Sequence, residues 1–171
     1  MKRDTKPLVS SFLSCEKDTE TILKKLFVEN RQYSDILKRL LVVSNSDALD
    51  QSYDVSEYSL KKLIDEKYIV LTPEIEMPEN AKLKAFIVLS FDNFTPNQTN
   101  PEFRDCMIHI DVVCHHEIWL LGNYRQRPMK ILGYIDGMLN KARLSGIGEL
   151  NFISAVYGLL NDDWSSYSLS Y

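Results

Sequence analysis

Long apolar runs are missing from this 171-residue sequence, and none reaches the roughly 18 apolar residues that a membrane-spanning helix needs. The basic segment Met1–Pro7 is followed by only a short apolar stretch, so the uninterrupted core of a secretory signal is missing as well. From these two absences we expect a soluble protein that is made in the cytoplasm and contacts no membrane.

Cysteine is scarce, and the three present, Cys15, Cys106 and Cys114, form an odd-numbered set without the spacing of a disulfide framework. A chain of this length can bury a hydrophobic core without disulfide bonds. Because cysteine prefers protein interiors, we expect three buried or half-buried thiols.

Residue types that bind metals occur together only in one segment, which contains Cys106, His109, Cys114, His115 and His116. A zinc site needs about four such groups converging on one point. The segment has the pattern of a strand, so alternation places Cys106, Cys114 and His116 on one face and the other two histidines on the opposite face. We therefore expect no metal site here.

Catalytic signatures are also missing. The sequence has no Gly-x-Ser-x-Gly nucleophile turn, no Walker phosphate loop and no dinucleotide fingerprint, and we interpret Gly146–Gly148 as a helix stop. Asp162–Asp163 has the character of a solvated turn. We expect no enzyme activity and no cofactor; the rival hypothesis is a small metal-dependent hydrolase that uses His109, His115 or His116.

A strong positive charge is absent, since the formal net charge is −4 and the isoelectric point is near 5.4. An extended nucleic-acid surface would require clustered lysine and arginine. The exception is a local group, Arg125 and Arg127 with Lys130, where a helix is expected to begin. This group could contact DNA phosphates or an acidic partner, or it could simply be solvated.

The sequence does contain a consistent order of periodic segments, which predicts a single domain over residues 1–171. Its first part is an arm at 1–16 and a helical lead at 18–66, with helices starting near Asp18 and Ser34, a loop at 44–54 and a third helix capped by Ser56. Its second part, 68–171, contains the sheet: strands at 68–72, 82–91 and 103–117, a loop at 92–101, a helix at 127–143, and strands at 149–160 and 165–171 joined by a turn. We expect both faces of the 82–91 strand to be covered for part of its length, and the long strand at 103–117 to be central in the sheet. The fold class predicted from this order is α+β, with a mostly antiparallel sheet of about five strands packed on helices.

The last strand shows a period of two. Tyr167, Leu169 and Tyr171 share one face, and serines at 166, 168 and 170 occupy the other. We expect this strand to lie at an edge of the sheet, where unpaired backbone must be covered or paired with another chain. The three apolar residues are therefore candidates for an interface.

Two further features are candidates for contact with another protein. Asn93, Phe94 and Asn97 lie in the predicted loop, where aromatic and polar residues together suit a contact surface. Gly133 and Gly137 lie on the predicted helix opposite its apolar stripe, which would allow close approach of a neighbouring backbone, although the two glycines could also be merely tolerated there.

The order of elements resembles the tail-terminator and head-tail joining proteins of tailed bacteriophages. The resemblance covers roughly residues 60–171. It rests on the strands at 68–72, 82–91 and 103–117, on Arg127-Pro-Met-Lys-Ile-Leu-Gly-Tyr-Ile-Asp-Gly-Met-Leu-Asn140, on Gly146-Ile-Gly-Glu-Leu150 and on Tyr167-Ser-Leu-Ser-Tyr171.

The resemblance implies a structural subunit of the virion neck or tail. Such proteins assemble into a ring, commonly a hexamer, that closes the tail tube and joins it to the head connector, and they carry no catalytic residues. The implied partners are other copies of the chain, the neighbouring neck and tail-tube proteins and, transiently, DNA passing through the ring. A head-completion or stopper protein is the alternative connector.

Overall fold

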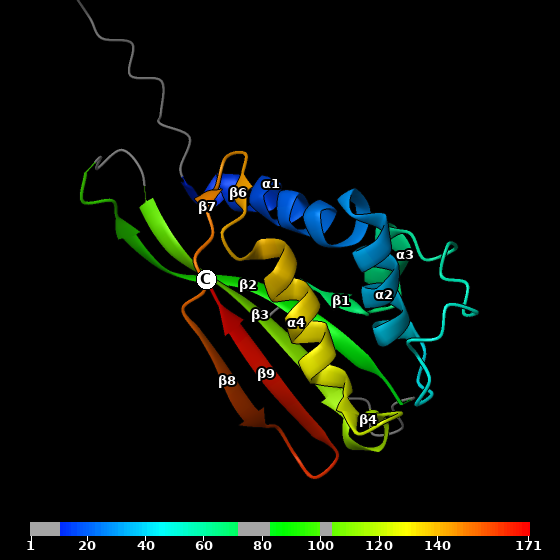
Figure 1. Cartoon of the computed structure of the whole chain (residues 1–171). Coiled ribbons are helices and arrows are strands. Elements are labelled where there is room, and N and C mark those ends of the chain that lie inside the picture. The colour runs from blue at the N-terminus through cyan, green and yellow to red at the C-terminus, as the bar shows by residue number, and fades with distance from the viewer. Residues whose placement is uncertain (1–10, 72–82, 100–103) are drawn as a thin grey trace, which may run out of the picture.

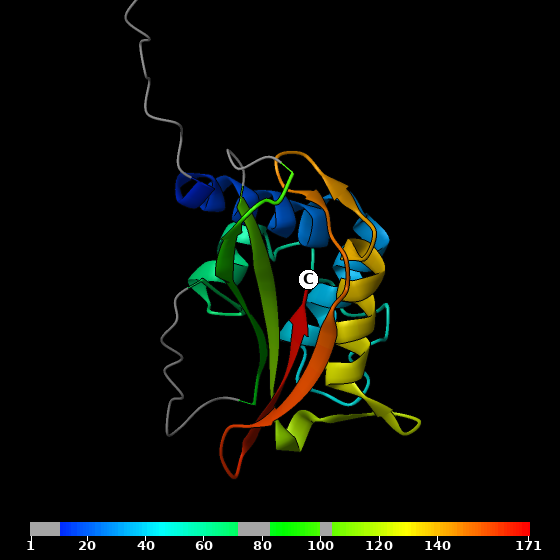
Figure 2. The same ribbon diagram turned by 90° about the vertical axis from the view of Figure 1, so that its left-hand side faces the viewer.

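The computed structural model describes residues 11–71, 83–99 and 104–171, which form a sheet with helices packed against one face (Figures 1 and 2). Within these ranges no helix has the length and apolar character needed to cross a membrane. The predicted α+β class is confirmed. In chain order the elements are α1 (Ser11–Lys24), η1 (Lys25–Glu29), α2 (Arg31–Val42), α3 (Leu60–Asp65), β1 (Ile69–Val70), β2 (Ala85–Pro96), β3 (Arg104–His115), η2 (His116–Ile118), β4 (Leu120–Leu121), β5 (Arg125–Gln126), α4 (Arg127–Leu139), β6 (Arg143–Leu144), β7 (Gly148–Glu149), β8 (Ser154–Leu159) and β9 (Trp164–Ser170).

The main sheet has the strand order β1-β2-β3-β9-β8. Only β1 and β2 are parallel; β2 with β3, β3 with β9, and β9 with β8 are antiparallel pairs. As predicted, the long strand β3 lies at the centre, because strands pair with it on both sides. Two small hairpins, β4 with β5 and β6 with β7, lie outside this sheet.

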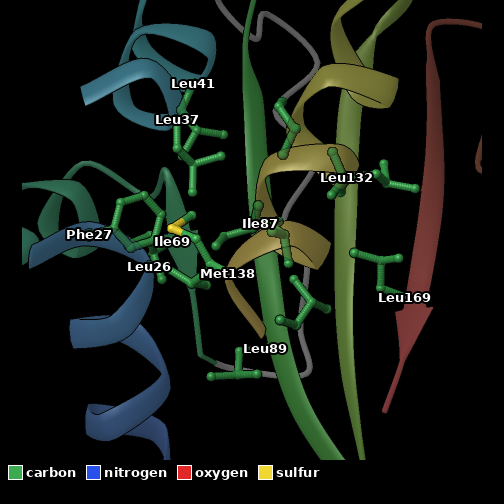
Figure 3. Packing of buried hydrophobic residues seen from close by; sticks show 14 of the residues in the cluster. Leu26, Phe27, Leu37, Leu41, Ile69, Ile87, Leu89, Leu132, Met138 and Leu169 are labelled. Carbon is green, nitrogen blue, oxygen red and sulfur yellow. The ribbon is translucent and has the colours of Figure 1, made fainter. Parts of the chain in front are cut away.

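The core lies between the sheet and the helices, as Figure 3 shows with Leu37 of α2, Ile87 of β2 and Met138 of α4. On β3 the alternation is regular, since Ile108, Ile110, Val112 and Cys114 all face this core. Most of the remaining core members come from α1, η1, α2, α3, α4 and the inner faces of the strands, which explains the apolar stripes seen in the sequence.

The opposite face of the sheet is covered over part of its length. Phe86 and Val88 of β2, Val113 of β3 and Trp164 of β9 form a second, smaller buried cluster there. The prediction that both faces of the second strand are partly buried is therefore confirmed.

The helical lead begins earlier than predicted. Residues 1–10 lie outside the described part, but α1 already begins at Ser11, so the arm does not extend to residue 16 and Asp18 is not a cap. One contact that the sequence pattern could not show is tertiary, because the Phe12 ring lies 4.6 Å from the Phe94 ring. In the second helix, Asn30 rather than Ser34 is the N-cap, and its side chain accepts a bond from Tyr33 N–H.

The third helix and the first strand are shorter than predicted. Ser59, not Ser56, caps α3, because its side chain accepts a bond from the backbone N–H of Lys62. The predicted strand 68–72 is reduced to Ile69–Val70, and residue 72 and the connection that follows lie outside the described residues.

The predicted loop at 92–101 is mostly strand, which corrects the prediction. β2 continues to Pro96, and its pairing with β3 shifts register between Asp92 and Thr95. Asn93 in this bulge has a φ of 51°. A bulge accommodates turn-favouring residues without ending the pairing of the two strands. Asn93 and Pro96 therefore belong to the strand and do not mark the start of a loop. Residues 100–101 lie outside the described part.

Helix α4 begins at Arg127 as predicted, with Pro128 in its first turn, but it ends at Leu139 rather than at 143. Asn140 is extended and Lys141 has a φ of 63°, which ends the helix. The segment Gly146–Gly148 is thus not a helix stop. It belongs to the β6–β7 hairpin, where both glycines adopt positive φ values.

The last strand is not an edge, contrary to the prediction. β9 lies between β3 and β8, and the edge beside it is β8 (Figure 1). Leu169 and Tyr171 are buried in the core, and Tyr167 is half-buried against it. The alternation of this strand was predicted correctly, but alternation alone does not reveal how many neighbours a strand has.

Arg127 is completely buried at the start of α4, where neither a phosphate nor solvent reaches it. Its guanidinium donates four hydrogen bonds of 2.7–2.8 Å to the carbonyl oxygens of Ile118, Leu40, Val43 and Asn45. Leu40 and Val43 belong to the C-terminal end of α2, where free carbonyls carry partial negative charge. Both readings of this residue from the sequence, a phosphate contact and a solvated helix entrance, are therefore wrong.

We predict that Arg127→Leu lowers the free energy of unfolding by at least about 3 kcal/mol, because one buried unsatisfied polar group costs about 1–3 kcal/mol. Urea denaturation monitored by tryptophan fluorescence measures this loss. The exposed Arg125, changed to Ala, is the control and should cost about 1 kcal/mol or less. An Arg127→Leu variant as stable as this control would contradict the assigned role.

Candidate interaction surface

The described part of the chain has an open sheet edge at β8. In this part β8 pairs only with β9, and Figures 1 and 2 show it at the border of the molecule. Its side chains are unusually exposed for an apolar segment: 59% for Val156, 52% for Tyr157 and 66% for Leu159. Phe152 and Ile153, just before the strand, are exposed as well.

A shallow hollow adjoins this strand on the side of the sheet that carries the helices. It is lined by His116, Trp119, Leu120, Tyr157 and Ser165. Leu120 is 63% exposed, so the apolar surface of β8 continues across the hollow onto the β4–β5 hairpin. We call β8 together with this hollow the β8 surface.

A chain of hydrogen bonds fixes the β8 surface. His116 Nδ1 lies 2.9 Å from the carbonyl oxygen of Asp162, so Nδ1 carries the proton and donates. In the neutral ring Nε2 then accepts from Ser165 Oγ, 2.7 Å away, and that hydroxyl accepts from Tyr157 OH at 2.9 Å. These hydrogen bonds connect η2 to the β8–β9 hairpin.

The serine–histidine contact has the spacing of a nucleophile and its base, but its surroundings suit positioning better. Ser165 is only 1% exposed, and a backbone carbonyl rather than a carboxylate orients His116. The Ser165 hydroxyl is also hydrogen-bonded to Tyr157 OH. The arrangement holds Tyr157 in place on β8.

The other histidines lie on the opposite face of the sheet. His109 Nδ1 is 3.0 Å from Ser170 Oγ, and the His115 ring packs edge-on against Trp164 at 5.0 Å. The strand alternation proposed for these two residues is correct, whereas His116 belongs to η2. Among the described residues, no three His, Cys, Asp or Glu side chains come together in a way that could hold a metal ion.

Burial disfavours the reactive thiolate form of the cysteines. Cys114 is fully buried in the core, and burial raises the pKa of its thiol to about 12. Burial also raises the pKa of the half-buried Cys15 and Cys106 thiols. Cys15 and Cys106 are half-buried and Cys114 is buried, as predicted.

The contact candidates predicted in the 92–101 segment lie on the β2–β3 hairpin, away from β8. Phe94 packs on Phe12, and Asn97 Nδ2 donates to the Asp105 carboxylate at 2.9 Å. These side chains thus have partners within the chain. Arg125 is exposed, and its Nε donates to Gly122 O at 2.9 Å.

The two helix glycines are exposed, as predicted. A Cβ atom added at Gly133 or Gly137 would meet no other atom within 4 Å. The face is therefore accessible, whereas Leu169 and Tyr171 are buried in the chain's own core and cannot form an interface in the folded chain.

Sequence reasoning missed the β8 surface. The signal was present, since residues 152–160 contain no charged residue and no proline. Natural edge strands usually carry such residues to discourage pairing. Their absence could have indicated an edge that accepts a partner, but the edge was assigned to the wrong strand.

A protein-family model, YomW, matches residues 34–171. This family comes from the SPBc2 region of a Bacillus phage, so the match is to a phage-associated family. No curated protein and no solved structure matches the chain.

We predict that His116→Ala and Ser165→Ala each lower the free energy of unfolding by about 1–2 kcal/mol, because each breaks the hydrogen-bond chain. The double variant should lose less than the sum of both, since the two side chains share one bond. Urea denaturation of the four proteins in this cycle measures the coupling, and Tyr124→Phe, on a fully exposed side chain, serves as the control. Strictly additive losses would contradict the proposed contact.

Proposed function

Because this chain belongs to the YomW family, which is phage-associated, we propose that it is a structural subunit of a phage or phage-like neck. In this proposal its copies form a ring, of six subunits by analogy with the tail terminators that the sequence resembles. The ring ends the tail tube and joins it to the head connector. The partners are other copies of the chain and the neighbouring neck and tail-tube proteins.

The observation that carries the proposal is the β8 surface. A monomeric protein gains nothing from an apolar edge strand that lacks charged side chains, because such an edge favours aggregation. A subunit that must pair with others during assembly needs one. Val156, Tyr157 and Leu159 supply this surface, and their exposure is over half in each case.

We also propose that the protein has no catalytic role. Ser165 is buried and its hydroxyl is already bonded to Tyr157, and burial raises the pKa of the cysteine thiols, which disfavours the reactive thiolate. Binding through surfaces would then be the whole of its chemistry.

Native mass spectrometry of the purified chain tests the ring directly. We expect one closed assembly of fixed stoichiometry, because a ring saturates its contacts when it closes, and negative-stain images should show a central opening. A head-completion or stopper protein would differ in ring order and in the neck protein that copurifies with it. A chain that stays monomeric at all concentrations would contradict the proposal.

The exposed glycine side of α4 gives a second test. Gly133→Ala and Gly137→Ala should each stabilise the subunit by about 0.5–1 kcal/mol, because alanine favours the helix and the added Cβ meets open space. If a neighbouring subunit approaches this face, Gly137→Leu should leave the melting temperature of the subunit unchanged and reduce the fraction of protein in rings. Normal ring formation by Gly137→Leu would show that the glycines are merely tolerated.

A further inference from the structure

The backbone of β8 has one free side. The N–H of Leu160 donates to Trp164 O at 3.0 Å, so these two residues form a hydrogen-bonded pair. Such pairs alternate along an antiparallel ladder. Even-numbered residues of β8 therefore bond to β9, and the odd-numbered Ala155, Tyr157 and Leu159 direct their N–H and C=O groups away from the sheet.

Nothing on β8 discourages a further strand. Its register with β9 is continuous from Ser154 to Leu159, and residues 152–160 carry no charge and no proline. Charged side chains, prolines and bulges are the usual means of protecting an edge. An extended segment can thus add to this edge by main-chain hydrogen bonds, with side-chain contacts setting the choice of partner.

The far end of the same sheet offers a matching edge on β2. Strand β1 covers only Ile87 and Val88, so from Leu89 onward the described residues place no strand on that side of β2. The N–H of His115 donates to Lys84 O at 3.1 Å, which makes this a hydrogen-bonded pair. By the same alternation, the odd-numbered Leu89 and Phe91 direct their backbone groups outward.

The directions of the two edges also match. Three successive antiparallel pairings separate β2 from β8, so the two strands run in opposite directions. In a ring whose strands lie roughly along the axis, β8 of one copy therefore meets β2 of the next in antiparallel orientation. Tyr157 and Leu159 would then continue the apolar, helix-bearing face on which Leu89 and Phe91 already pack.

We propose that β8 of one subunit pairs with the outer side of β2, over Leu89–Asp92, in a second copy of this chain. The inference rests on the proposed ring, because a closed ring requires contact between two different surfaces. It names the two surfaces, and it predicts one sheet that continues from subunit to subunit.

Two neighbouring proline variants test the free edge. Ala155→Pro removes an N–H that points away from the sheet, so the subunit should fold with a similar melting temperature while its ring fraction falls at least tenfold. Val156→Pro removes an N–H that bonds to β9 and should instead destabilise the fold. Leu159→Lys should also yield folded monomers, because a charged edge resists pairing; Val28→Lys, at a 55% exposed apolar site in η1, is its control and should form normal rings.

Hydrogen exchange then identifies the partner strand. Peptides covering 152–160 and 89–92 should exchange more slowly in wild-type rings than in Leu159→Lys monomers. Protection of 152–160 alone would overturn the pairing with β2. A dimer in which β8 of one copy pairs with β8 of the other would overturn it as well. If rings still form with both Ala155→Pro and Leu159→Lys, the β8 contact is overturned but the proposed ring is not. A wild-type chain that never assembles would overturn both proposals.

Discussion

A buried guanidinium that bonds backbone carbonyl oxygens, and no carboxylate of the described residues, connects the helical layer of this protein to its sheet. Arg127 satisfies carbonyl oxygens from the end of α2, from the loop after it and from η2. Arginine can do this because its planar fork offers several donors in fixed directions and remains charged when buried. Through this one side chain, the start of α4 is held against segments more than 80 residues earlier, and α4 in turn covers β3 and β9.

The sequence predicted what local patterns can specify. The α+β class, the central position of β3, the start of α4 at Arg127 and the alternation of β9 all follow from period and helix-start signals. What it did not predict depends on tertiary partners. The buried role of Arg127 needs four carbonyls that are distant in sequence, and the β2 bulge at Asn93 resembles a loop when only its residues are considered.

The β8 surface was likewise only partly predictable from local sequence patterns. Nine uncharged residues at 152–160 are visible in the sequence, but their meaning depends on whether the strand lies at an edge. That position is decided by β9, which inserts between β3 and β8. The hydrogen-bond chain through His116 was equally hidden, because Ser165 lies 49 residues away from its partner.

The strand order also implies that the β8 edge forms late in folding. Among the described elements β8 joins the sheet only through β9, and β9 must first pair with β3, whose pairing residues lie 49 to 61 positions earlier in the chain. Contacts of such long range form slowly. An incompletely folded chain thus presents no ordered β8 edge, so under the proposed pairing only subunits with a complete sheet could join a ring.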